Sequence, residues 1–334
     1  MMATINDGNP TLSDMASRLQ DKKIAAIIEM LEQTNEVLDD MTWQMANDGT
    51  NHKTTVRSGL PTVAWRMLNY GVPPSKSRTV QVKDSCGMLE GYSEIDKALA
   101  DLNGNTASFR LSEDQGFLQS MNNDLATALV YGNIETDPEQ IMGLAPRYDD
   151  LSAENAENII DGGGTGSDNT SIWFVIWSPN ICHGIFPNGS KAGLQQKDLG
   201  EVTLEDADGG YYQGYRSHYK WDCGLTLRDW RGVSRIANID VSDLSDAGET
   251  GYDGANIPNL MIKAYHKIRK RRKMGRAAIY CNETVMTALD LIASNRSNTW
   301  FTTSDGIDGM PILKFRGIPI RECDAILDTE AIVS

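Results

Sequence analysis

The four histidines are the first residues that could do chemistry, because an imidazole serves as a general base or a metal ligand near neutral pH. The chain has no His-Glu-x-x-His pair and no Gly-x-Ser-x-Gly turn that would present a nucleophile for a histidine to activate. Ordinary structural roles are therefore predicted for His52, His183, His218 and His266.

Five cysteines are the second source of nucleophiles and metal ligands. They are scattered, and even the closest two, Cys182 and Cys223, lack the short spacing of a zinc knuckle or a redox motif. An odd number without a pairing pattern also argues against a disulfide scaffold. We expect reduced, mostly buried thiols at Cys86, Cys182, Cys223, Cys281 and Cys323.

The acidic and glycine-rich segments offer little for metal or phosphate binding. Asp240, Asp243 and Asp246 are spaced by three, which misses the alternating oxygen ligands of a calcium loop, so we expect turn and cap residues. No Gly-Lys-Ser/Thr follows the glycines of residues 162–166, which favours a flexible loop over a phosphate cradle. No cofactor and no metal site is predicted, although 46 acidic residues leave a glycosidase-type carboxylate pair open.

Eight basic residues, with no acid among them, lie between Lys263 and Arg276. The helix dipole accounts for one or two cations near a helix C-terminus, at about 0.3–1 kcal/mol each, whereas eight indicate a partner. Because the net charge of the chain is -15, an acidic surface of another copy is favoured over DNA or RNA. The predicted partner-binding patch is Lys267, Arg269, Lys270, Arg271, Arg272 and Lys273.

The length and composition predict a globular protein of mixed α and β structure. The 334 residues favour two subdomains, and 40% hydrophobic residues are too many for a disordered chain. The longest strongly apolar run, residues 172–177, is far short of the roughly 20 residues that span a bilayer, and the N-terminus lacks a secretory signal. We expect no membrane segment and a protein that stays in the cytoplasm where it is made.

Two segments near the N-terminus are predicted to form an arm and a hairpin. Apolar residues recur three or four apart over residues 24–41, which predicts an amphipathic helical arm that ends at the turn residues 47–51. From residue 54 to 68 the period becomes two, and residues 79–83 resume the alternation after a stiff turn at 71–77. These patterns predict a long two-stranded hairpin.

This hairpin has no core of its own. An isolated two-stranded ribbon is only marginally stable in water, so a ribbon of this length is expected to pack against something else, with a neighbouring subunit as the first candidate. The residues predicted to make this contact are Trp65, Met67, Pro73, Pro74 and Lys76.

The middle of the chain predicts a long helix followed by a second subdomain. A capping box at residues 112–115 begins a helix that runs to Tyr131 and is about 30 Å long. Residues 172–177 form an apolar strand, and residues 211–222 form a half-buried strand whose odd positions point inward. Its aromatic side chains are expected in the core and not in a sugar-binding platform.

The last third of the chain predicts two helices and returning strands. The basic patch belongs to a helix over residues 258–274. A strand at residues 277–280 is followed by a helix that Asn282 caps, and turn residues divide residues 299–326 into strands.

The order of these segments resembles the major capsid proteins of tailed bacteriophages, which have the Hong Kong ninety-seven type fold. The likeness covers nearly the whole chain, and several of its segments are similar to coat proteins of short-tailed phages. They are residues 55–61 with Trp65 and residues 69–71, residues 102–105 with 109–112, and residues 315–320.

The resemblance implies an α+β fold with an N-terminal arm, an extended hairpin loop, a peripheral domain with a spine helix, and an axial domain. The implied boundaries are 1–50 for the arm, 51–95 for the loop, 96–140 and 299–334 for the peripheral domain, 112–131 for the spine helix, and 141–298 for the axial domain.

It also implies a structural function and no enzymatic one. Many copies would assemble as hexamers and pentamers into an icosahedral shell that encloses double-stranded DNA without sequence-specific binding. Scaffold, cement and portal proteins are the implied further partners, and the protein would be assembled in the bacterial cytoplasm and reside in the virion capsid. Noncovalent closure is expected, because most relatives lack the cross-link for which Lys76 would be the hairpin candidate.

Two alternatives stay open at this stage. One is an acidic cytosolic α+β hydrolase with a carboxylate pair and an aromatic-lined groove in residues 200–230. The other is a nucleic-acid-binding assembly factor that uses the basic helix. The size of the particle in solution distinguishes these classes from a shell subunit.

Overall fold

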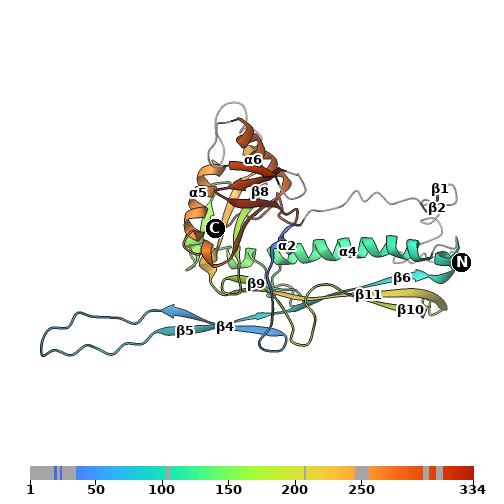
Figure 1. Cartoon of the computed structure of the whole chain (residues 1–334), viewed down its shortest axis with the longest axis horizontal. Helices are drawn as coiled ribbons and strands as arrows, with labels where there is room; N and C mark the ends of the chain where they lie inside the picture. The colour runs from blue at the N-terminus through green and yellow to red at the C-terminus, as the bar shows by residue number, and fades with distance from the viewer. Residues whose placement is uncertain are drawn as a thin grey trace.

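The computed structural model describes residues 19–20, 23–24, 35–102, 106–206, 208–244, 256–295, 301–305 and 311–334. A hairpin projects to one side, a layer of long strands with a long helix extends to the other, and a compact lobe stands above their junction (Figure 1). Most of the predicted amphipathic arm lies outside the described residues, which include one helical turn of it, α2 (Val37–Asp40). Before it, β1 (Leu19–Gln20) pairs with β2 (Lys23–Ile24).

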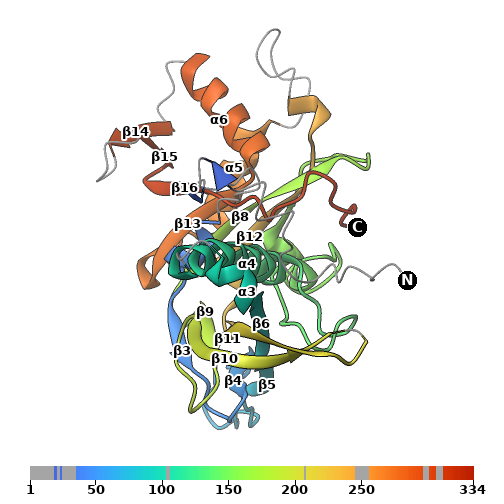
Figure 2. The ribbon, with the colours of Figure 1, turned by 90° about the vertical axis from the view of Figure 1, so that its right-hand side faces the viewer.

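The long-strand layer consists of three antiparallel strands and two helices. β11 (Tyr211–Leu227) is the central strand, and it pairs with β10 (Gln195–Glu205) on one side and with β6 (Gly87–Asp96) on the other. The helices α3 (Lys97–Asp101) and α4 (Thr106–Tyr131) lie against this layer (Figure 2). α4 therefore runs along the long strands and packs against them.

The inward face of β11 agrees with the predicted alternation over part of its length. Tyr219 is fully buried, and its ring lies 6.5 Å from that of Phe117 on α4, measured between centroids. Tyr211 begins the strand and is exposed, because the layer extends there beyond the cover of the helix. The aromatic residues of this strand thus serve the core where α4 covers them.

The compact lobe is a continuation of the same sheet. From the far end of β11 the sheet passes to β9 (Cys182–Phe186), β8 (Asn169–Trp177) and β13 (Arg276–Cys281). β12 (Val233–Asp240) pairs with β8, and β7 (Ile159–Asp161) pairs with β12. One long strand, β11, therefore belongs to both parts and couples them mechanically.

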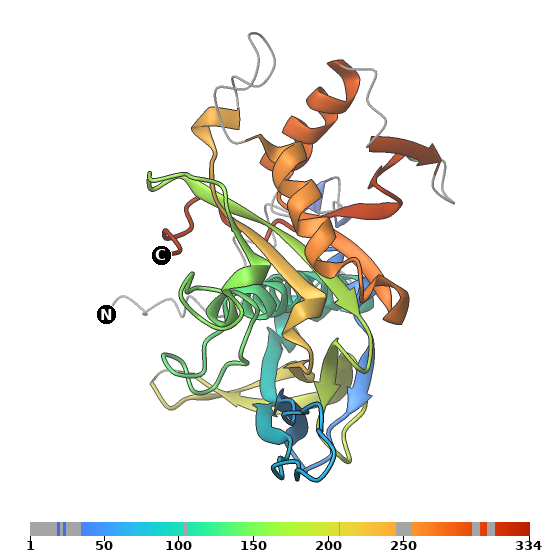
Figure 3. The ribbon, with the colours of Figure 1, turned by 90° about the vertical axis from the view of Figure 1, so that its left-hand side faces the viewer.

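Two helices cover the lobe (Figure 3). α5 (Ile257–Ile268) packs on β8 and β12, and α6 (Glu283–Asn295) follows β13. The predicted cap is confirmed, since the Asn282 side-chain oxygen accepts a hydrogen bond from the Val285 amide at 3.0 Å. The predicted strand–helix unit at this point is correct.

The predicted tail strands are confirmed as β14 (Phe301–Asp305), β15 (Pro311–Phe315) and β16 (Ile318–Glu322). They extend the sheet of the lobe, because β16 pairs in parallel with β13, whereas the resemblance placed residues 299–334 in the peripheral domain with the spine helix. After these strands the chain returns to the end of α4, where the Tyr131 hydroxyl accepts a hydrogen bond from the Leu327 amide at 2.9 Å.

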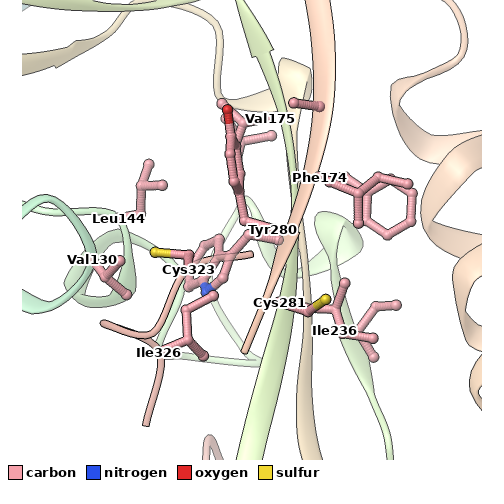
Figure 4. Packing of buried hydrophobic residues seen from close by; sticks show 14 of the residues in the cluster. Val130, Leu144, Phe174, Val175, Ile236, Tyr280, Cys281, Cys323 and Ile326 are labelled. Carbon is pink, nitrogen blue, oxygen red and sulfur yellow. The ribbon is translucent and has the colours of Figure 1, made fainter. Parts of the chain in front are cut away.

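β8 is the centre of the hydrophobic core. Every residue of this strand is buried, because β12 and β13 flank it and helices cover it. Figure 4 shows Phe174 and Val175 of this strand among side chains from β12, β13 and the chain end. The expected buried thiols are found at Cys182, Cys223, Cys281 and Cys323, while Cys86 is half-buried.

The long helix is confirmed, but it begins at Thr106 and not at the predicted capping box. Ser112 lies in its second turn. The cause is tertiary: Phe109 is 1% exposed and packs with Ile95, Leu99 and Ala100, which stabilises helical turns ahead of the box.

The predicted basic helix over residues 258–274 is wrong in its last six residues. α5 ends at Ile268, and a short 3-10 turn at Arg272–Met274 precedes β13. Arg271 turns toward Asp229, with 2.5 Å between Nε and Oδ2, and Arg272 donates to the carbonyl of Gly317 at 3.0 Å. These tertiary contacts end the helix earlier than its apolar period suggests.

Candidate assembly surfaces

The hairpin forms a sheet of its own, with β4 (Asn51–Gly59) paired to β5 (Arg78–Ser85) and to no other described strand. The prediction of a hairpin is confirmed, but the predicted strand over residues 54–68 ends at Gly59. The pairing register shifts between Arg57 and Gly59, which disrupts the ladder at that point. The described strands leave residues 60–77 without a partner strand.

The tip of the hairpin also differs from the prediction. The chain turns between Met67 and Tyr70, whose amide donates to the Met67 carbonyl at 3.2 Å. Asn69 takes a φ of 68°, a left-handed conformation that asparagine adopts more readily than most residues. The proline-rich segment at 71–77 is thus the returning segment of the loop and not its turn.

Large apolar side chains within residues 60–77 are almost fully exposed to solvent. Trp65 is fully exposed, and Met67 and Leu68 are 72% and 85% exposed. Exposed apolar patches of this kind mark interaction surfaces. Pro73, Pro74 and Lys76 are exposed as well, on the returning segment.

Sequence reasoning missed several apolar residues of the same surface. A paired strand was expected to expose the side chains of one face only, whereas the unpaired segment exposes the side chains of both faces. The missed residues are Leu60, Leu68, Tyr70 and Val72.

The root of the hairpin is fixed by buried polar contacts. Arg147 lies 2.9 Å from the buried carboxylate of Asp84 on β5, measured between Nη2 and Oδ1. The same nitrogen donates to the carbonyls of Met142 and Leu225, both at 3.2 Å. Beside it, β3 (Trp43–Met45) pairs with β9. The hairpin is held firmly at its base and uncovered at its tip.

Two histidines meet at this root. The rings of His52 on β4 and His183 on β9 lie edge to face, with centroids 5.4 Å apart, and His183 is completely buried. Desolvation lowers the pKa of His183 to about 4 and, together with the positive charge of Arg228, also lowers the pKa of His52. Both imidazoles are neutral at neutral pH and pack as structural residues.

The six residues of the predicted basic patch divide into two groups. Arg271 and Arg272 make the internal contacts described above and hold the turn in place. Lys267, Arg269, Lys270 and Lys273 are exposed, and in the described part of the chain they take part in no ion pair. The nearby Arg276 is an internal partner of buried Asp40, at 2.5 Å.

The hydrolase alternative requires a carboxylate pair in an aromatic-lined groove formed by residues 200–230, and the structure does not place the two together. A cavity of about 600 Å³ lies where α4 meets the start of β6, with Asp124, Asp137 and Glu139 among its lining residues. Of the expected groove at residues 200–230, only Cys223 reaches it. Within the described ranges, no cluster of three or more His, Cys, Asp or Glu could hold a metal ion. No described helix is long and apolar enough to cross a membrane.

Comparison with solved structures shows the class of protein. A chain in the cryo-EM structure of bacteriophage Epsilon15 is 39% identical, with 99% of both chains covered and a TM-score of 0.77. Weaker matches include an encapsulin from Synechococcus elongatus (9% identity, 69% and 97% of the two chains, TM-score 0.47). A chain from Mycobacterium phage Bobi matches at 12% identity (68% and 97%, TM-score 0.43). The first match identifies a virion capsid protein with the Hong Kong ninety-seven type fold.

A family model described as Major capsid protein GP7 matches residues 19–334. The chain therefore belongs to this family of phage major capsid proteins. Membership confirms the prediction of a structural virion component and not an enzyme. None of the curated proteins matches the chain.

Proposed function

We propose that copies of this chain assemble as hexamers and pentamers into a closed icosahedral shell around double-stranded DNA, and that the hairpin of each copy lies on an adjacent copy. The observation that carries the proposal is the exposed apolar tip on a buried, rigid root. In this arrangement the long-strand layer serves as the peripheral domain and the compact lobe as the axial domain.

The energetics favour a docked hairpin. Fully burying one large apolar side chain contributes about 1.5–3 kcal/mol relative to leaving it in water. Trp65, Met67 and Leu68 together offer several such contributions, while part of the gain offsets the entropy lost on association. Since the root is already fixed in the free subunit, docking has to order only the unpaired residues 60–77.

The acidity of the chain fits a container for DNA. A net charge of -15 repels phosphate over most of the surface, so packaged DNA is held by enclosure and not by adhesion. We infer that DNA binding is not sequence-specific, and that scaffold, cement and portal proteins act as further partners.

The experiment compares wild-type protein with Trp65→Ala/Met67→Ala by sedimentation and electron microscopy. Wild-type protein is expected to form shells hundreds of Å across, whereas the variant is expected to remain in small oligomers, because the tip has lost its apolar contacts. Thermal unfolding of the unassembled subunit should be unchanged, since both side chains are exposed.

Met88→Ala is a matched control for Met67→Ala, because it removes the same side chain from an exposed position on β6, outside the hairpin tip and the basic turn. It should assemble as wild type does. Wild-type protein that stays monomeric or hydrolyses a glycan would refute the shell function and support the hydrolase alternative. Shells of normal yield from the double variant would refute the role of the hairpin.

A further inference from the structure

One exposed segment of the compact lobe carries acidic side chains and no basic ones. Between Arg147 and Lys191 the chain contains no Lys or Arg. The segment that connects α4 to β8 in this stretch exposes five carboxylates, and none of the ion pairs of the described residues includes them. They are Asp149, Asp150, Glu154, Glu157 and Asp161.

A second exposed segment of the lobe carries basic side chains and no acidic ones. Along α5 and the turn that follows it, residues 256–282 contain no acid. After the internal pairs of Arg271, Arg272 and Arg276 are set aside, five exposed cations remain. They are Lys263, Lys267, Arg269, Lys270 and Lys273.

No ion pair of the described residues joins the two surfaces within one subunit. The end of the acidic segment, Ala156–Asn158 with β7, packs beside α5, whereas the turn that carries Arg269, Lys270 and Lys273 follows the end of that helix. Both surfaces are therefore left for another copy to pair with, and because they are two different surfaces, the contact between two copies is head to tail. Repeated by rotation, a contact of this kind closes into a ring.

We propose that the basic turn of one compact lobe binds the acidic connection of the next copy around a ring of subunits. This inference rests on the proposed shell function and names two of the surfaces that meet within each ring. Exposed charge pairs contribute little affinity each, so their role is to set the orientation and rate of association and to reject wrong partners. DNA is the rival occupant of the basic turn, but the acidic surface matches it in number of charges and is present on every copy.

The experiment uses charge reversal in the full chain. Arg269→Glu/Lys270→Glu places carboxylates against the acidic connection, and Glu154→Lys/Glu157→Lys places cations against the basic turn. Each double variant is expected to lower the fraction of protein in assembled particles by about tenfold or more. The quadruple variant that combines them restores opposite charges and should recover assembly close to that of wild type.

Lys191→Glu/Lys197→Glu is the matched control, because it reverses two exposed lysines elsewhere and changes the net charge by the same amount. It should assemble normally, and all variants should unfold at the same temperature as wild type when unassembled. Absence of rescue in the quadruple variant would overturn the proposal, as would equal damage from the control. Shells of Arg269→Glu/Lys270→Glu that form in normal yield but lose DNA would assign the turn to nucleic acid instead. Wild-type protein that forms no shells would refute the proposed function itself.

Discussion

A buried network at the chain end shows how single residues join distant parts of the chain. Glu330 and Arg235 are both almost fully buried, with 2.9 Å between Oε2 and Nη2. Glu330 also accepts hydrogen bonds from the hydroxyls of Tyr131 and Ser171, at 2.5 and 2.8 Å. Burial, with the adjacent carboxylate, raises the pKa of Tyr131, so this phenol stays protonated and remains a donor. The network ties the tail to α4, β8 and β12.

Glu330→Gln should destabilise the subunit by about 3–5 kcal/mol, because it leaves the guanidinium of Arg235 buried without a countercharge. Replacing both partners with methionine should cost less, since no charge is then left unpaired. Urea unfolding of the unassembled subunit measures both effects. If Glu330→Gln proves as stable as the double methionine variant, or more stable, the buried Glu330–Arg235 pair does not have this role.

The histidine pair predicts a pH dependence at the hairpin root. Folding lowers the pKa of His183 from 6.5 to about 4, so the folded state favours the neutral imidazole. The associated stability is fully present above pH 6.5 and is lost as the pH falls toward 4, by up to about 3 kcal/mol. The charged groups near the pair are Asp84, Arg147 and Arg228.

The measurement is the free energy of unfolding of the unassembled subunit at pH 7 and at pH 4.5. His183→Asn should show a smaller difference between the two values than wild type does. His266→Gln is the control, because it replaces an exposed histidine on α5, outside the hairpin root, with a neutral side chain. Equal pH dependence in wild type and His183→Asn would exclude this role.

At the scale of elements, a helix end that depends on residues close in the sequence was predicted correctly. Helix ends that depend on tertiary contacts were not. The cap at Asn282 was correct because it depends on residues three apart. The start of α4 was missed because it depends on Phe109 packing against residues of β6 and α3. The end of α5 was missed for the same reason, since Asp229 and Gly317 hold the arginines that follow it.

The cap makes a quantitative prediction. Asn282→Ala should destabilise the subunit by about 1–2 kcal/mol, because it removes the acceptor for the Val285 amide and leaves that donor buried. Asn282→Ser should cost less, because a serine oxygen also caps helices. Chemical unfolding checks the order of the two, and a serine variant less stable than the alanine variant would contradict it.

The hairpin was predicted correctly, but the length of its unpaired segment was not predicted. Alternating residues continue past Gly59, and no local rule shows that the partner strand is absent there. We expect backbone amides of residues 60–77 to exchange hydrogen rapidly in the unassembled subunit and to become protected in the shell. Hydrogen exchange with mass spectrometry compares the two states, and the root strands β4 and β5 provide the internal reference. Slow exchange at the tip of the free subunit would contradict the account.

For the whole molecule, the proposed assembly role follows from apolar side chains that a single subunit cannot bury. The compact lobe has a complete core around β8, whereas the hairpin tip has none. The sequence predicted this imbalance from its patterns, but it could not show which cations were free, because pairing with Asp229 and Asp40 joins segments far apart in the chain.

The most direct test of the central claim is a cryo-EM reconstruction of particles assembled from this chain, at a resolution that traces side chains. In such a reconstruction, Trp65, Met67 and Leu68 of each copy are expected to be buried against a neighbouring copy. Density in which the hairpin folds back on its own subunit, or in which these side chains stay in solvent within a closed shell, would contradict it.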